Sequence, residues 1–441
     1  MNHELFESTP IPKAYFTLSL PLVFSMVITL IYNIIDTFFI AQTGNANLVA
    51  GIALGAPLFT LLLAVGDIFA LGGSSVISRL FGRKQIKDGT RVSVWCFYTA
   101  FFFGLFIAVL LLVFQHPILH LLGANAETYS YAESYYHWLA IGSPFIIVSL
   151  VPSNLLRTEG RAMASMFGTV LGAVINIILD PIFIFTLNYG AAGAAIATII
   201  GYFISVVFFI FYICKSDSQL SWNPKAFTLH IREIPAIIAI GIPASITNFM
   251  QSLSIALTNR FLLVYGASAI AAMGIVMKIN MIASLILIAF AFGAQPLLGY
   301  NYGAKNIFRL KNCLKFSYIF EIFIGACFTV ILSVLAPHLI RFFMNNATII
   351  QLGTPMVRLQ VISMIFVGII LVTTTAFQSF GYALGSLFLS ISRQGIIFTI
   401  CIIILSKVFG YYGTISAQAV SDLVTAGIAI SLLIHFRKQI K

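Results

Sequence analysis

The sequence is a succession of long apolar runs separated by short polar breaks. A bilayer core about 30 Å thick needs roughly 20 apolar residues for each helix that crosses it, and the runs are of that length or longer. Of the 441 residues, 60% are hydrophobic and 8% are charged, whereas soluble domains have roughly a quarter charged residues. The chain is therefore predicted to be an integral membrane protein without a separate soluble domain.

Twelve membrane spans are expected, six in each half of the chain. Backbone polar groups find no water inside lipid, and runs this long lack the alternation of barrel strands, so each span is predicted to be a helix. The expected fold class is all-α, a polytopic membrane protein with twelve transmembrane helices. The spans lie near residues 15–40, 49–77, 92–114, 130–152, 162–186, 191–214, 236–264, 269–298, 313–336, 350–380, 387–409 and 413–436.

Two pairs of matching segments indicate an internal repeat. Residues 21–44 align without a gap with residues 243–266, at an offset of 222, and each segment runs from a proline to a glycine. In a second match, Lys84 lies opposite Lys305. Six spans return the chain to its starting side, so a parallel repeat of two six-helix lobes is predicted. The expected domains are an amino-terminal lobe with a cation site (1–214), a cytoplasmic linker (215–235) and a carboxyl-terminal lobe (236–441).

The basic residues indicate how the chain is oriented. Most of the 24 Lys and Arg residues, with Arg157 and Arg393 counted among them, fall on one side of the expected spans. Cytoplasmic loops retain Lys and Arg, so both termini are expected in the cytoplasm. The same bias accounts for the net charge of +11. No nucleic-acid partner is expected, because the chain has no basic domain with stacking aromatic residues.

Acidic residues inside spans are the first candidates for function, because ionisable groups are costly in hydrocarbon. Five acids qualify, namely Asp36, Asp67, Asp180, Glu321 and Asp422. Asp36 and Asp180 have the richest polar company: Tyr32 and Asn33 precede Asp36 by one helical turn, Asn176 precedes Asp180 likewise, and Thr198 lies on the next span. These residues are predicted to form a buried polar cluster. The alternative is a hydrogen-bond network that only fixes helix packing; for Asp67 and Asp422 both interpretations stay open.

The second half has a different set of charges. Arg260 and Lys278 are the ionisable residues of spans seven and eight, and Glu321 lies on span nine. A buried ion pair is favoured over a cationic wall that faces the substrate, because an unpaired buried charge is strongly disfavoured. The five cysteines have no CxxC spacing, so neither a disulfide nor a cysteine metal site is expected.

Four motifs resemble those of the multidrug and toxic compound extrusion (MATE) family. They are YNIID ending at Asp36, RLFG beginning at Arg79, RTEG beginning at Arg157, and NIILDP from Asn176 to Pro181. The resemblance extends over essentially the whole chain, and the branch is the one related to the DNA-damage-inducible exporters and the staphylococcal multidrug pumps. It implies two six-helix lobes, a central cleft, and exchange of protons or sodium ions for drugs.

The same resemblance assigns roles to individual residues. The cation site of the family's amino-terminal lobe corresponds to Asp36, Asn176, Asp180 and Thr198, with Asn154 as a further member on span four. Pro21 corresponds to the proline at which the first helix bends. The sequence departs from a second branch that uses an acid on span seven, because no acid lies between Glu233 and Glu321.

The expected function is secondary active antiport, in which amphipathic, cationic small molecules leave the cell by alternating access in exchange for protons or sodium ions. The alternative within the superfamily is a flippase for lipid-linked oligosaccharides, which Arg260, Lys278 and Arg358 would favour. An ATP-driven pump is excluded because the chain has no GxxxxGK[ST] loop, and a channel is the third possibility. No catalytic constellation is apparent. The chain is therefore expected to be no enzyme and to need no cofactor. It is expected to act as a monomer in the cytoplasmic membrane of a prokaryote.

The coupling ion is expected to be the proton rather than sodium. Burial and a neighbouring acid both disfavour two charged carboxylates, which favours a proton shared by Asp36 and Asp180. Sodium is the alternative, because the two carboxylates together with oxygens of Asn176 and Thr198 would also suit a hard cation. Asp36 and Asp180 would then be its metal ligands.

Overall fold

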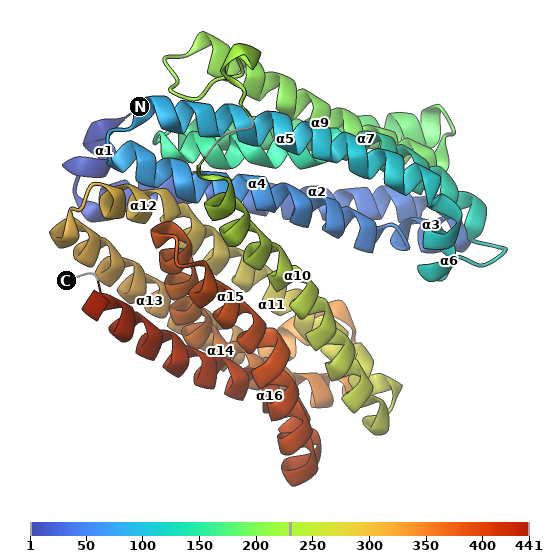
Figure 1. Ribbon diagram of the computed structural model, residues 1–441. Coiled ribbons are helices and arrows are strands. Elements are labelled where there is room, and N and C mark those ends of the chain that lie inside the picture. Colours follow the sequence, from blue (N-terminus) through green and yellow to red (C-terminus); the bar gives the residue numbers. More distant parts are fainter. Residues whose placement is uncertain (1, 229–231, 440–441) are drawn as a thin grey trace. The chain divides into compact units, whose positions relative to one another are not determined.

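The computed structural model describes residues 2–228 and 232–439, and this part of the chain is built of helices and short loops without a β-strand (Figure 1). The expected all-α fold class is confirmed. The helices are α1 (His3–Glu7), α2 (Ile11–Gln42), α3 (Ala46–Ala53), α4 (Ala56–Gly82), α5 (Ile86–Val113), α6 (Gln115–Leu121), α7 (Tyr129–Thr158), α8 (Ala162–Pro181), α9 (Gly190–Lys215), α10 (Ile234–Leu262), α11 (Ala267–Gly293), α12 (Gln295–Gly303), α13 (Ile307–Phe343), α14 (Ala347–Phe380), α15 (Ala383–Ile391) and α16 (Ile397–Gln439). Short π-helical turns, η1 (Ile182–Thr186) and η4 (Ser392–Ile396), and 3₁₀ turns, η2 (Pro224–Ala226) and η3 (Leu263–Tyr265), complete the set.

The number of spans agrees with the expected twelve. Within the described residues, 11 helical stretches are long and apolar enough to cross a membrane, and the last of them, Ala383–His435, has 53 residues. One crossing needs only about 20 residues. Gly410 interrupts this stretch with φ 56° and ψ −126°, so the stretch holds two spans. Several helices extend beyond the apolar runs, as α13 does around the expected span 313–336, because the helix continues past the stretch that contacts hydrocarbon.

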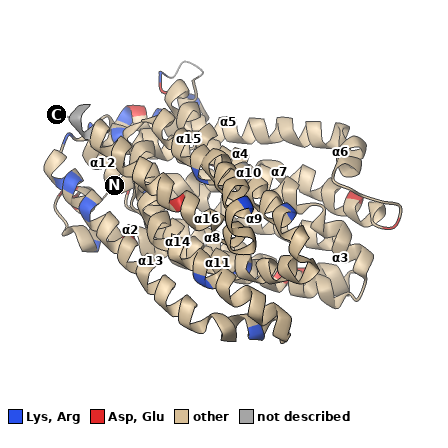
Figure 2. Ribbon diagram, turned by 90° about the horizontal axis from the view of Figure 1, so that it is seen from below, with Lys and Arg blue, Asp and Glu red and all other residues tan. Residues whose placement is uncertain are grey.

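The surfaces of the helices suit a lipid environment. Charged residues are sparse along the ribbon (Figure 2), whereas large apolar side chains such as Leu121, Val264 and Phe342 are more than four-fifths exposed. A soluble protein rarely exposes so much contiguous apolar surface. In a bilayer this surface faces the acyl chains, as the composition predicts.

The chain folds into two compact units. Unit 1 comprises residues 1–9 and 24–241, and unit 2 comprises residues 10–23 and 242–441. Helix α2 therefore contributes its first part to unit 2 and its remainder to unit 1. Pro21 lies inside α2, two residues before this division, and proline removes one backbone hydrogen bond from a helix interior.

The internal repeat is visible in the backbone itself. Residues with positive φ recur at separations of 220 to 222 positions: Gly44 and Gly266 (66° and 88°), Lys84 and Lys305 (62° and 55°), Gly160 and Gly381 (80° and 83°), and Gly190 and Gly410 (51° and 56°). Positive φ is uncommon for residues other than glycine. Its recurrence at the two aligned lysines shows that the turns after α4 and α12 repeat one backbone conformation, which supports the predicted repeat.

The first part of the segment between the two halves is attached to unit 1. The Trp222 ring stacks on Phe97, with 4.0 Å between the ring centroids. Glu159, which is fully buried, accepts hydrogen bonds from the Ser218 hydroxyl (2.7 Å) and from the backbone N–H of Gln219. These contacts hold residues 218–222 against unit 1, near the C-terminal ends of α7 and α9.

Candidate functional site

Two acidic side chains from different helices of unit 1 meet inside the expected membrane region. Asp180 is fully buried at the end of α8, and Asp36 is half-buried on α2. Their carboxyl groups lie within hydrogen-bonding reach of each other. One oxygen of each, Asp36 Oδ1 and Asp180 Oδ1, is buried without a hydrogen-bond partner in the described part of the chain. Two carboxyl groups in such contact need a proton or a cation between them, because two bare carboxylates would repel each other.

Asn176 connects this acid pair to α9. When its amide nitrogen faces the acid, Asn176 donates to Asp180 Oδ2 over 3.1 Å. Its oxygen then accepts from the Thr198 hydroxyl (3.2 Å) and from the Thr198 backbone N–H (2.9 Å). The reverse orientation would place the amide oxygen against the carboxylate, acceptor against acceptor, so the first orientation is the satisfied one. Asn176, Asp180 and Thr198 therefore form one hydrogen-bonded chain.

Glycines bring α8 and α9 close enough for these bonds. A Cβ atom built on Gly172 would lie 2.6 Å from the carbonyl oxygen of Gly201, and one built on Gly201 would lie 2.6 Å from the carbonyl oxygen of Gly172. Small residues allow such close helix approach in membranes. Because Gly172 precedes Asn176 by one helical turn, the same contact aligns Asn176 with Thr198 across the interface.

Three tyrosines surround the acid pair. Tyr32 and Tyr135 are electrostatic neighbours of both Asp36 and Asp180, and Tyr202 is a neighbour of these two phenols. Sequence reasoning pointed to Tyr32 and missed Tyr135 and Tyr202. Tyr202 had a usable signal, because it follows Thr198 by one helical turn and so shares its helix face. No comparable signal marked Tyr135, which comes from the distant helix α7.

The backbone changes immediately after Asp180. Pro181 follows, and the π-helical turn η1 (Ile182–Thr186) replaces regular α-helix. Proline has no backbone N–H to donate to the preceding turn, and single π-helical turns are frequent at functional sites. Asp180 therefore lies where the regular α-helix ends and the π-helical turn begins.

The remaining residues of the predicted cluster lie elsewhere. Asn33 is exposed on α2. Asn154 is buried, but its hydrogen bonds go to the Leu150 carbonyl (2.9 Å) and to the Arg157 guanidinium. Arg157 is itself only 4% exposed and has Asp67 as its electrostatic neighbour. Asn154 thus belongs to a separate polar group of α4 and α7, in which Arg157 is buried in the last turn of α7.

Unit 2 does not contain the ion pair that was expected there. Arg260 and Lys278 are exposed, whereas Glu321 is fully buried and neither of its carboxyl oxygens has a hydrogen-bond partner among the described residues. The sequence could not show which face of each helix turns inward. A different pair forms instead: Arg393 Nε lies 3.0 Å from Asp422 Oδ1, and both side chains are largely buried. Arg393, like Arg157, is therefore largely buried and not an exposed charge.

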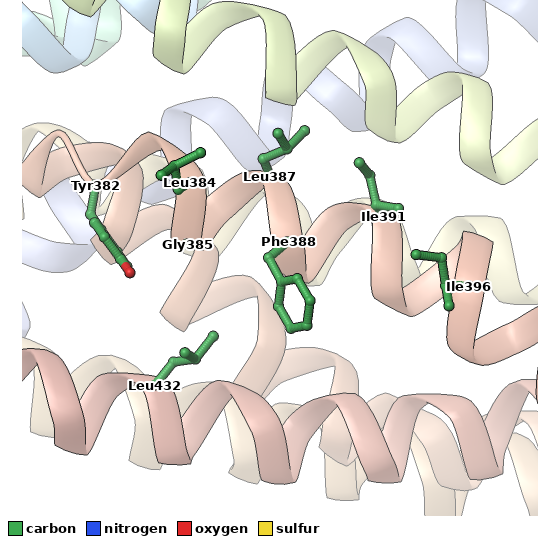
Figure 3. A pocket seen from close by; sticks show the side chains of 8 residues that line it. All are labelled: Tyr382, Leu384, Gly385, Leu387, Phe388, Ile391, Ile396 and Leu432. Atoms are coloured by element: carbon green, nitrogen blue, oxygen red, sulfur yellow. The ribbon is translucent and has the colours of Figure 1, made fainter.

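A pocket in unit 2 has the opposite character to the acid site. It has a volume of about 460 Å³ and lies between α15 and α16 (Figure 3). Its lining is apolar except for one tyrosine hydroxyl, and consists of Tyr382, Leu384, Gly385, Leu387, Phe388, Ile391, Ile396 and Leu432. This pocket offers no group that would bind a charge. The described residues also contain no group of three or more His, Cys, Asp or Glu side chains that could hold a metal ion.

The chain is similar to known membrane transporters in sequence. A family model described as MatE matches residues 21–182 and 243–404, two segments at the offset of 222 that the repeat predicts. The chain is 31% identical to the multidrug export protein MepA of Staphylococcus haemolyticus over 436 residues, which cover 99% of this chain and 96% of that protein. It is 29% identical to MepA of Staphylococcus aureus over 439 residues, which cover 98% and 96%.

Solved structures show the same fold. The structure of an outward-facing conformation of a multidrug resistance MATE family transporter of the MOP superfamily matches with a TM-score of 0.93, at 23% sequence identity. The match covers 99% of this chain and 98% of the other. The architecture of two repeated halves expected from the sequence is thereby confirmed.

Proposed function

Because this chain belongs to the MatE family of multidrug and toxic compound extrusion transporters, we propose that it is a secondary active antiporter that exports amphipathic, cationic small molecules. The ion that it takes up in exchange is a proton, bound at Asp36 and Asp180. One observation carries this assignment: the two carboxyl groups face each other in a buried site, and each has an oxygen without a partner. The names of the MepA relatives, multidrug export proteins, support the substrate class.

The proposed cycle depends on the charge of the acid pair. With one proton bound, the hydroxyl of one carboxyl group donates to an oxygen of the other and the pair carries a single negative charge. With the proton released, two carboxylates repel each other, and a nearby cationic substrate stabilises them. Proton uptake from outside therefore favours substrate release there, and α2 rearranges around Pro21 between the two states. Return to the inward-facing state discharges the proton into the cytoplasm.

The hydrogen bonds of Asn176 favour the proton over sodium. Its amide oxygen has two lone pairs, and both accept hydrogen bonds from Thr198. Hard cations take about six oxygen ligands, and sodium would have to displace these bonds to recruit Asn176 and Thr198. A proton shared between two carboxyl oxygens leaves them intact.

The flippase alternative lacks support. It relied on a basic cavity that would hold a pyrophosphate, formed by Arg260, Lys278 and Arg358. Each of these residues is exposed on its own helix, and Arg358 donates to the Ser333 carbonyl. The MepA relatives, which match over nearly their whole length, are exporters by name. We therefore infer transport without enzymatic chemistry, by a monomer in the cytoplasmic membrane.

The decisive experiment is efflux from proteoliposomes that contain the purified protein. A lipophilic fluorescent cation should be transported when an inward proton gradient is imposed without sodium, and a protonophore should stop the transport. Transport that continues with the protonophore but requires a sodium gradient would reverse the choice of ion. Rapid flux that needs neither gradient would identify a channel and refute antiport.

The orientation needs a separate test, since both termini are proposed to be cytoplasmic. Single cysteines at Asn47 and at Lys84, in a background without other cysteines, should react with a membrane-impermeant maleimide from outside and from inside, respectively. Both side chains are exposed, so poor access would not explain a failure. The opposite pattern would invert the topology.

A further inference from the structure

Unit 2 contains a buried acid that the proposed exchange site does not use. Glu321 lies on α13 with no exposed surface, and within residues 2–228 and 232–439 neither of its carboxyl oxygens has a hydrogen-bond partner. On its backbone side it is tightly enclosed, because a Cβ atom built on Gly368 of α14 would lie 3.1 Å from its carbonyl oxygen. An acid buried without bonds is costly unless it is neutral.

The polar group that faces Glu321 is the hydroxyl of Tyr15. Tyr15 is 1% exposed and interacts electrostatically with Glu321, and its hydroxyl has no other partner in the described region. Aromatic rings hold it in place: its ring centroid lies 5.2 Å from that of Phe316, 5.5 Å from that of Phe320 and 6.3 Å from that of Phe290. Tyr15 belongs to the segment 10–23 of α2, the part that folds with unit 2.

No positive charge compensates Glu321. The charged or titratable side chains on the neighbouring helices are exposed or engaged elsewhere. The basic side chains on these helices are exposed, namely Lys13, Lys278, Lys315 and Arg358. Tyr318 is hydrogen-bonded to Thr373 (2.8 Å), and Tyr302 stacks on Phe380. Tyr300 and Cys313 are buried, and neither carries a positive charge. Glu321 forms no ion pair among the described residues. Neutralisation must therefore come from a ligand.

We propose that Glu321, together with the Tyr15 hydroxyl, is a second proton-binding site that lies in unit 2 and exchanges its proton during each transport cycle. The ligand is a proton and not a metal cation, because the site offers two carboxylate oxygens and one phenol oxygen among aromatic rings, far fewer than a hard cation needs. The proton passes from water to the carboxylate, and the resulting O–H lies against the Tyr15 hydroxyl.

Release of the proton requires an opening of this site. The carboxylate left behind would have a single donor, the Tyr15 O–H, whereas a buried carboxylate normally needs several donors or a cation. Because Tyr15 faces Glu321 and belongs to the first part of α2, displacement of this segment would open that side of the site to water. Proton release from Glu321 is thus coupled to displacement of residues 10–23. This inference rests on the proposed antiport and adds a second proton to it.

The test counts protons per exported molecule in proteoliposomes, with a pH-sensitive dye and a fluorescent cation. Glu321→Gln keeps the shape of the side chain but cannot exchange a proton, so the count should fall by one while export continues. Tyr15→Phe should shift the pH at which export is half-maximal. Tyr318→Phe is the matched control, because it removes a half-buried phenol of α13 whose hydroxyl bonds to Thr373, and its proton count should equal that of the unmodified protein.

Infrared spectroscopy of the purified protein gives a readout that does not depend on transport. The carbonyl band of a protonated, buried carboxylic acid should disappear in Glu321→Gln and shift in Tyr15→Phe. A band unchanged in both variants would overturn the inference. Loss of the band with an unchanged proton count would overturn it too, because Glu321 would then be permanently neutral. If Glu321→Gln does not fold, the band shift in Tyr15→Phe decides. If the unmodified protein fails to export, the proposed antiport fails, while the infrared result still shows whether Glu321 carries a proton.

Discussion

The two repeated halves have one backbone plan but different chemistry at equivalent positions. Counting 222 residues onward, Asp36 of unit 1 corresponds to Thr258 of unit 2, and Asp180 corresponds to Ile402. The Thr258 hydroxyl donates to a carbonyl of its own helix (2.8 Å), and Ile402 is fully buried in an apolar cluster. At the two positions that correspond to the facing acids of unit 1, unit 2 therefore has no ionisable residue.

Asn176 completes the contrast. Its counterpart is Phe398, which packs against Ile402 and Ala417 in the same apolar cluster. The polar centre of unit 2 is instead the Arg393–Asp422 pair, to which Gln418 adds a hydrogen bond of 3.1 Å. Its charges compensate each other, whereas the charges of the acid pair in unit 1 do not. The glycines and turns thus preserve the fold, while a few side chains give each half its own set of ionisable groups.

The largest effect is expected from removal of either acid of unit 1. Asp36→Asn and Asp180→Asn should each reduce proton-driven export to the level of protein-free vesicles, because an amide cannot exchange a proton. The equivalent change in unit 2, Thr258→Val, should leave export within about twofold of the unmodified protein. Export assays with equal amounts of folded protein check this. Loss of activity in Thr258→Val, or full activity in both acid variants, would break the comparison.

Next in size is the loss of the compensated pair in unit 2. Arg393→Ala leaves Asp422 buried without its cation and should destabilise the protein by about 3 to 5 kcal/mol. The double variant Arg393→Met with Asp422→Leu removes both charges and should recover most of that stability. Thermal unfolding in detergent measures both. An Arg393→Ala variant as stable as the unmodified protein would show that the pair does not hold α16 in place.

A smaller effect is expected at the glycine contact between α8 and α9. Gly172→Ala forces the helices apart and should destabilise unit 1 by about 1 to 3 kcal/mol, with weaker coupling because Asn176 and Thr198 separate. Gly274 on α11 is the matched control, since a Cβ atom there would meet nothing within 4 Å. Gly274→Ala should be neutral or slightly stabilising. Equal effects at both glycines would mean that helix propensity alone determines them.

The smallest effect concerns the repeated turns. Lys305 has φ 55°, and glycine adopts this conformation without the cost of about 1 kcal/mol that a side chain brings. Lys305→Gly should therefore raise the unfolding temperature slightly. Lys311→Gly, inside the regular helix α13, should lower it by a similar amount. The opposite order would show that the turn after α12 is not strained by its lysine.

The fold could be predicted from the sequence because membrane helices are long, uninterrupted apolar runs. Long apolar runs located the twelve spans, and the alignment of prolines and glycines revealed the repeat. Among the predicted site residues, the structure brings Asp36, Asn176, Asp180 and Thr198 together, and their helical spacing was the clue. The roles of these residues remain proposals.

Contacts between helices that are distant in sequence could not be predicted. Arg393 and Asp422 meet because η4 and α16 pack together, while Lys278 turns outward. In a span that is apolar on all sides, the hydrophobic pattern does not distinguish the lipid face from the core face. Tyr135 was missed for the same reason, because the sequence does not show which residues of other helices a tyrosine in an apolar helix contacts.

The division of α2 between the units has a consequence for how the chain folds during synthesis. Tyr15 packs against the rings of Phe316 and Phe320, which are synthesised about 300 residues after it. At about 5 to 20 residues per second, a ribosome needs roughly 15 to 60 s to reach them. Until then, the leading segment of α2 lacks its final partners, so α2 cannot complete its packing before most of unit 2 has been inserted.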